Sequence, residues 1–98
     1  MANKLNKGRI DRILKKHKRD IKGLGVERIS LFGSFLEGVQ KGRSDVDFLV
    51  RFRKGKHTFD NYFDLRFLLE HLLKRKIDLI TEKSLKPALR NVRRRTIL

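Results

Sequence analysis

Apolar residues recur along the chain at two spacings, one typical of helices and one of strands. The earliest run spans residues 7–22, where basic residues separate apolar positions at three- to four-residue intervals: Ile10, Ile13, Leu14 and Ile21. This pattern predicts an amphipathic helix with one buried side. A nearby pair of glycines, Gly23 and Gly25, favours the end of that helix.

Three later segments have strand patterns: Val26–Phe32, Val46–Phe52 and Lys76–Ile80. The first alternates apolar and polar residues, as in a strand with one buried face. The second is almost continuously apolar, as in a strand covered on both faces. A long helix is predicted between the second and third strands, capped by Thr58 or Asp60 and ending near residue 74. We therefore expect a single α/β domain over residues 1–98, with a small mixed sheet of about three strands and helices packed on it.

Two shorter helices complete the prediction. The segment 34–39 is too short to be stable alone, so packing must hold it through Phe35, Leu36 and Val39. A last helix is expected after Ser84, with Pro87 in its first turn and a buried stripe of Leu85, Leu89 and Val92. Its exposed side would carry four arginines: Arg90, Arg93, Arg94 and Arg95. They could bind phosphates, dock an acidic partner or form a solvated tail.

The long helix has two apolar stripes. One should face the sheet, because its members share a side at 100° per residue: Tyr62, Leu65, Leu69, Leu72 and Leu73. The other stripe consists of Phe59, Phe63 and Phe67 and points well away from the first. Either the helix is buried over a wide arc, or this aromatic stripe is a protein-binding patch.

The charge of the chain is strongly unbalanced. Lys and Arg number 26 against 11 Asp and Glu, a formal net charge of +15. Such a surface attracts polyanions, so a triphosphate, an acidic protein and nucleic acid are candidate partners, while a merely solvated surface is the alternative. The absence of Cys excludes disulfides and thiolate zinc sites, and the three His residues lack ligand spacing. No apolar run has membrane-spanning length and the N-terminus is charged, so we expect a cytoplasmic protein without a membrane partner.

Candidate chemistry is concentrated between residues 31 and 50. Gly33 and Ser34 follow the first predicted strand, and a glycine there permits a tight turn whose backbone amides can receive phosphate oxygens. Asp45 and Asp47 begin the second strand, where residues two apart project from the same face. Both carboxylates can then reach one divalent cation, and hard oxygen ligands suit Mg²⁺ or Mn²⁺. Asp78 is the only charge in the apolar centre of the third strand.

These motifs resemble the nucleotidyltransferase signature of the DNA polymerase β-like superfamily. That signature is a Gly-Ser turn followed about a dozen residues later by Asp-x-Asp between apolar residues, with a third acid on a later strand. Here it is carried by Phe32-Gly33-Ser34, Ser44-Asp45-Val46-Asp47-Phe48 and Ile77-Asp78-Leu79-Ile80. The resemblance covers residues 8–90. With so few residues outside it, the chain is most similar to the minimal nucleotidyltransferases, the MntA-type antitoxins that pair with HEPN-domain toxins.

The resemblance implies a polymerase β palm-like fold and specific residue roles. Asp45, Asp47 and Asp78 would be the catalytic and Mg²⁺-binding residues, and the nucleotide-binding residues would be Gly33, Ser34 and Ser44. The implied reaction transfers AMP from ATP to a hydroxyl, usually a tyrosine of a HEPN toxin. Glu37 departs from the family, because many relatives carry Arg four residues after the motif glycine.

Two other functions stay open from the sequence. One is a binding module that neutralises a toxin without turnover, and the other is a basic nucleic-acid-binding domain. No aromatic residues interleave the N-terminal lysines to stack bases, which disfavours the second. Self-association is also possible.

Overall fold

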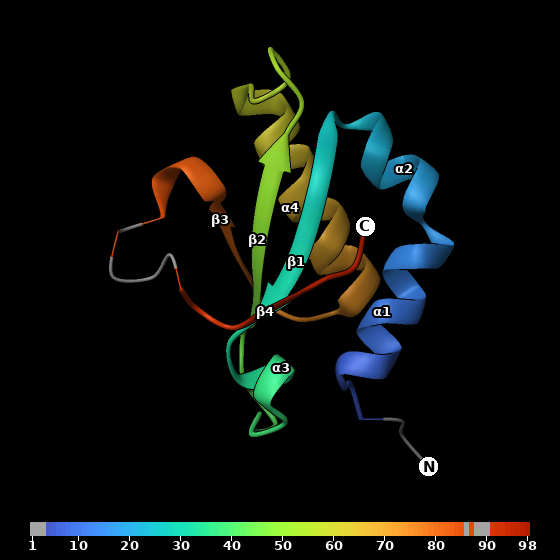
Figure 1. Cartoon of the computed structure of the whole chain (residues 1–98). Helices are drawn as coiled ribbons and strands as arrows, with labels where there is room; N and C mark the ends of the chain where they lie inside the picture. Colours follow the sequence, from blue (N-terminus) through green and yellow to red (C-terminus); the bar gives the residue numbers. More distant parts are fainter. Residues whose placement is uncertain (1–3, 86, 88–90) are drawn as a thin grey trace.

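The structure is a computed structural model that describes residues 4–85, 87 and 91–98. Figure 1 shows the order of its elements. The helices are α1 (Lys7–Lys16), α2 (Lys18–Gly23), α3 (Ser34–Glu37), α4 (Phe59–Leu73) and a 3₁₀ helix (Glu82–Ser84). The strands are β1 (Val26–Phe32), β2 (Val46–Phe52), β3 (Ile77–Thr81) and β4 (Arg94–Thr96). Within the described residues, none of the helices combines the length and apolarity needed to cross a membrane.

The four strands form one mixed sheet in the order β3-β2-β1-β4. β1 is antiparallel to both β2 and β4, whereas β2 and β3 are parallel. Parallel neighbours need a crossover connection, and α4 supplies it between β2 and β3. The predicted mixed α/β fold is confirmed, with β4 as an additional strand.

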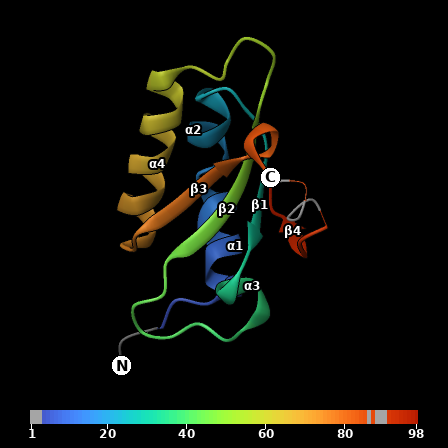
Figure 2. The same cartoon turned by 90° about the vertical axis from the view of Figure 1, so that its left-hand side faces the viewer.

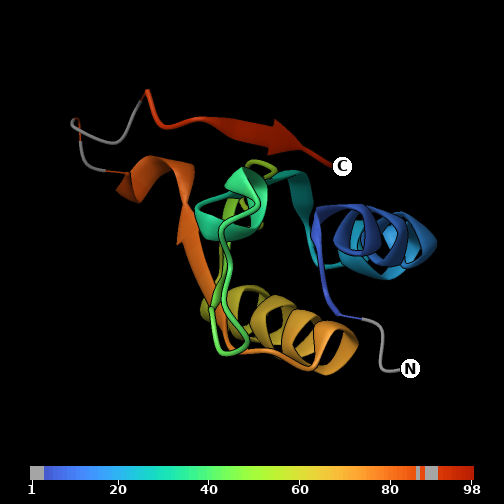
Figure 3. The ribbon, with the colours of Figure 1, turned by 90° about the horizontal axis from the view of Figure 1, so that it is seen from below.

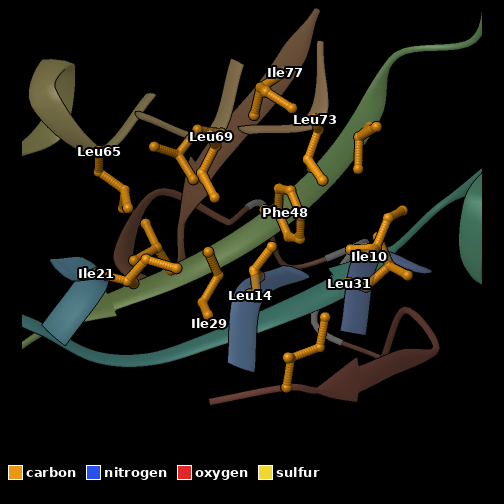
Figure 4. Packing of buried hydrophobic residues seen from close by; sticks show 14 of the residues in the cluster. Ile10, Leu14, Ile21, Ile29, Leu31, Phe48, Leu65, Leu69, Leu73 and Ile77 are labelled. Carbon is orange, nitrogen blue, oxygen red and sulfur yellow. The ribbon is translucent and has the colours of Figure 1, made fainter. Parts of the chain in front are cut away.

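The hydrophobic core lies between the sheet and the helices α1, α2 and α4, which cover one face (Figure 3). Seen along the sheet in Figure 2, α4 lies on one side of the strands and the C-terminal segment on the other. Alternate residues of the strands point into this core, and Figure 4 shows them packed against the helices: Ile29, Leu31 and Phe48 against Ile10, Leu14, Leu65 and Leu69. The opposite face carries polar side chains such as Ser30 and Asp47, together with the fully buried Leu49 of β2.

The first helix differs from its prediction because it is broken at His17. Asn6 caps α1 by accepting a hydrogen bond from the amide of Arg9 at 2.9 Å. The backbone of His17 leaves helical geometry (φ −105°, ψ 22°), and its amide bonds to the carbonyls of both Ile13 and Leu14. The predicted apolar side is nevertheless the buried one, with Ile10, Leu14 and Ile21 fully buried.

The long helix α4 begins and ends as its sequence predicts. The Thr58 hydroxyl accepts a hydrogen bond from the amide of Asn61, and Lys74 ends the helix with a left-handed conformation. Burial over a wide arc is wrong, because Phe59 is 77% exposed and Phe67 is 62% exposed. Both rings pack against Phe63 in an exposed aromatic stripe.

Two predictions near the short elements also change. α3 is held by buried Phe35 and Leu36, but Val39 is 68% exposed and lies beyond the helix end. Of the predicted last helix, residues 86 and 88–90, with Leu89 and Arg90, lie outside the described residues. Where the chain is described again it forms β4, because residues 94–96 pair with the free edge of β1.

Candidate active site

The strand register brings the sequence-predicted acids to one end of the sheet. β1 ends where β2 begins, and Phe32 pairs with Asp47. β2 and β3 begin at the same end, and Asp47 pairs with Asp78. Asp45 lies just before β2, and its carboxyl group is close enough to Asp47 to raise the pKa of that residue. Three segments that are distant in sequence therefore place Gly33, Asp47 and Asp78 side by side.

Gly33 fits against the Asp47 carboxylate. Its φ of 75° and ψ of −153° belong to a backbone region that other residues rarely adopt. A Cβ at this position would overlap the Asp47 carboxylate, within 2.9 Å of its Cγ. Glycine is thus required both by the turn and by the close approach of this carboxylate.

The electrostatics of the site are those of crowded acids. Burial, together with the nearby carboxyl groups of Asp78 and Asp45, raises the pKa of Asp47 from its ordinary value of 3.8 to about 6. Asp45 and Asp78 themselves are exposed. A cation beside Asp47 would offset both the repulsion and the loss of solvation.

The donor set suits a divalent cation such as Mg²⁺, although it is not a closed cage. Carboxylate oxygens are hard ligands, and Mg²⁺ is commonly bound by one or two carboxylates together with phosphates and water. Among the described residues, no group of three His, Cys, Asp or Glu side chains is arranged to hold a metal ion. The carboxylates fit a shared, open site that a bound triphosphate would complete.

A hollow of about 300 Å³ adjoins these acids, and we call it the acidic hollow. Its polar lining combines both signs of charge: Asp45, Asp78, Arg66, Lys76 and Tyr62. Gly33, Ser34 and Ser44 do not line it. Asp47 does not line it either, and the hollow lies between α4 and β3.

The two predicted serines have different surroundings. Ser34 begins α3 directly after Gly33, and its carbonyl accepts a hydrogen bond from the amide of Val39. The Ser44 hydroxyl accepts a hydrogen bond from the amide of Lys41 at 2.7 Å. That bond shapes the loop before β2, and it leaves the hydroxyl proton of Ser44 available to another acceptor.

The C-terminal strand adds arginines that the sequence placed only on a helix. β4 sets Arg94 opposite Phe32, next to Gly33. Arg93 donates a hydrogen bond to Glu37 in α3 at 3.2 Å. The charge of Glu37 is therefore compensated beside the Gly33-Ser34 turn. Sequence reasoning missed this arrangement because a three-residue strand carries almost no pattern.

Known proteins share these features. Residues 10–98 match the nucleotidyltransferase domain family. A relative from Methanocaldococcus jannaschii that is named as a protein adenylyltransferase is 42% identical over 78 residues, which cover 78% of each chain. A solved structure described as a minimal nucleotidyltransferase matches with a TM-score of 0.69 and 30% identity over 91% of this chain and 90% of that one.

A third likeness concerns the fold alone. The structure of a tri-AMPylated HEPN toxin of Shewanella oneidensis in complex with its MNT antitoxin contains a chain that matches with a TM-score of 0.65. The identity is 20%, and the match covers 93% of this chain and 71% of that one.

Proposed function

Since the chain belongs to the nucleotidyltransferase domain family, we propose that it transfers AMP from ATP to a hydroxyl group of a protein partner. The observation that carries the proposal is the convergence of Asp45, Asp47 and Asp78 beside Gly33, with the pKa of Asp47 raised to about 6. The name of the relative from Methanocaldococcus jannaschii supports a protein acceptor and an adenylyl group.

The reaction assigns a task to each residue. The acceptor oxygen attacks the α-phosphorus of ATP, the bond from that phosphorus to the bridging oxygen breaks, and pyrophosphate leaves. Asp78, which is exposed, takes the proton of the acceptor hydroxyl. The turn at Gly33 and Ser34 holds the departing phosphates through its backbone amides and hydroxyl, and Ser44 contributes a second hydroxyl.

Asp45 and Asp47 would hold the Mg²⁺, and Asp78 would accept the proton, since no group of three acids among the described residues is arranged to hold a metal ion. Mn²⁺ could replace it. When bound, the ion supplies positive charge for the phosphates and lowers the pKa of an oxygen that it contacts. The crowding of three carboxylates without it explains why Asp47 resists ionisation.

The proposed partner is a HEPN-domain protein, with this chain as its antitoxin. The complex of an AMPylated HEPN toxin with an MNT antitoxin supports a partner of this class. A formal net charge of +15 would favour an acidic surface on that partner. Glu37 need not weaken catalysis, because Arg93 offsets its charge beside the phosphate turn.

The test is label transfer from ATP carrying the label on its α-phosphate. The wild-type chain, Mg²⁺ and a HEPN-domain protein from the same genome should give a labelled HEPN protein, whereas label on the γ-phosphate should not transfer. Asp45→Asn should abolish the labelling. Labelling that survives this substitution would contradict the site.

The competing functions give different results. An inert neutralising module would protect cells from the toxin equally well as wild type and as Asp45→Asn. A nucleic-acid binder would show polynucleotide binding that weakens steeply with salt. Weak binding with a shallow salt dependence would exclude that function.

A further inference from the structure

Two more hollows follow the acidic hollow along β3, the edge strand that runs diagonally across Figure 2. The aromatic hollow has a volume of about 440 Å³ and lies between the start of α4 and the end of β3. Its apolar lining includes Phe59, Phe63, Leu79 and Ile80. The basic hollow has a volume of about 340 Å³ and is lined by Arg51, Arg53, Lys54 and Lys83, with Glu82 as its one carboxylate.

Neighbouring hollows share wall residues, and we refer to the three together as the groove. The acidic and aromatic hollows share Tyr62 and Leu79 in their walls. The aromatic and basic hollows share His57 and Thr81. The Tyr62 hydroxyl donates a hydrogen bond to the Leu79 carbonyl at 2.6 Å, so the wall at the first junction is fixed in place. A chain lying in this groove would pass from carboxylates to aromatic rings to cations.

We propose that this groove binds the acceptor segment of the protein substrate in an extended conformation, an inference that rests on the proposed function. The residue bearing the acceptor hydroxyl lies at the acidic hollow beside Asp78. A bulky apolar side chain of the same segment fills the aromatic hollow, and acidic residues reach the basic hollow. Asp78 lines the acidic hollow and Thr81, three residues further along β3, lines the aromatic hollow, so a segment extended beside β3 would carry its apolar residue about three positions from the acceptor.

The chemistry of the groove favours a polypeptide over a polynucleotide. A phosphate backbone would need cations along the whole path, whereas the lining of the aromatic hollow includes no Lys or Arg among the described residues. A peptide can instead match each part in turn, with an acidic end opposite Lys54 and Lys83. Phe59 is 77% exposed, as expected for an anchor that is covered only when the segment binds.

α4 provides a matched pair of variants for the test. Phe59 and Phe67 are both exposed and both pack against Phe63, with ring centroids 4.5 and 6.3 Å from it. Only Phe59 lines the aromatic hollow. Phe59→Ser and Phe67→Ser therefore remove similar exposed rings, and only the first changes the groove.

The experiment measures binding of a fluorescent peptide to the full chain by anisotropy. The peptide has about ten residues, with acidic residues at one end, a central Phe and a Tyr three positions away. We expect Phe59→Ser to weaken binding about tenfold and Phe67→Ser to change it less than about twofold. A peptide with Lys in place of its acidic residues should bind at least about tenfold more weakly.

The possible outcomes distinguish a failure of the groove proposal from a failure of the proposed function. Equal effects of the two Ser variants, equal binding of the two peptides, or no binding of the acidic peptide to the wild-type chain would overturn the groove proposal. So would loss of polynucleotide binding in Phe59→Ser with peptide binding unchanged. Peptide binding that persists in Asp45→Asn, combined with no AMP transfer by the wild-type chain, would instead contradict the proposed function.

Discussion

Two partly buried carboxylates in this protein have opposite surroundings. Glu82 receives hydrogen bonds from Arg28 at 2.8 and 2.9 Å, and these bonds hold its pKa below the usual value. Asp47 lies against two further acids, and burial with their charge raises its pKa to about 6. In a chain with 26 Lys and Arg residues, cations are plentiful. A carboxylate grouped with acids amid such a surplus is a candidate functional group, and the proposed Mg²⁺ would offset its surroundings.

Among the substitutions that test this comparison, removing the charge of Asp47 should have the largest effect. Asp47→Asn deletes a ligand of the proposed Mg²⁺, and we expect the rate of AMP transfer to fall at least about 10³-fold, equivalent to about 4 kcal/mol. Initial rates with α-labelled ATP measure this. Asp64→Asn, which removes an exposed acid of α4, should keep the rate within about twofold.

The same variant gives a pH dependence with a definite sign. Because the folded-state pKa of Asp47 is raised, protonation favours folding, and that contribution is lost as the pH rises from about 4 through about 6. Wild type should therefore lose stability relative to Asp47→Asn across this range in urea titrations. Added Mg²⁺ at pH 7 should restore it in wild type only. Parallel stability curves for the two proteins would exclude this assignment.

Gly33→Ala should have the next largest effect. The alanine would adopt a strained backbone and overlap the Asp47 carboxylate, so we expect a loss of about 2–4 kcal/mol in unfolding free energy. Gly38→Ala is the matched control, since Gly38 has a similar φ of 73° but nothing within 4 Å of a Cβ. Its loss should be about 1 kcal/mol. Equal losses would show that the contact with Asp47 is unimportant.

Arg28→Gln tests the other carboxylate of the comparison, Glu82, whose charge is compensated by Arg28. It leaves Glu82, whose side chain is 18% exposed, without its main cation, and we expect a loss of about 1–3 kcal/mol. The pKa of Glu82 is depressed, so this stabilisation is present above its ordinary value of 4.5 and is lost as the pH falls further. Arg51→Gln disrupts a more exposed pair with Glu27 and should have a loss below about 1 kcal/mol.

Glu37→Gln should have the smallest effect. Its partner Arg93 is 79% exposed, so solvent screens the pair and its contribution to stability is at most about 0.5 kcal/mol. The KM for ATP should change less than about threefold in steady-state assays. A much larger rise in KM, shared by Arg93→Gln, would show that the pair itself positions the phosphates.

The sequence predicts best where a periodic pattern coincides with burial. The strands β1, β2 and β3, the capped helix α4 and the buried stripe of α1 were each predicted from alternation or helical spacing, and each packs as expected. The proximity of Asp47 to Asp78 was implied only by the resemblance to the nucleotidyltransferases, and the register of β2 and β3 pairs the two residues.

The errors occur where tertiary contacts override local pattern. β4 contains only Arg94–Thr96, without apolar alternation, and it exists because β1 offers an unpaired edge. The exposure of Phe59 and Phe67 could not be deduced either, because helical spacing does not tell whether a second apolar stripe is covered as well. Neither the contact of Gly33 with Asp47 nor the groove along β3 has a signature in sequence alone.

The pairing of β2 with β3 fixes the position of Asp78, because the register of two strands can change only by whole residues. Asp78 stands level with Asp47 only in the present alignment of the two strands. A slip of β3 by one residue would turn Asp78 toward the helices and present Ile77 or Leu79 in its place. A change in the α4 connection that shifted the register by one residue would therefore remove Asp78 from the group of three acids completely. A change that kept the register would leave the group intact.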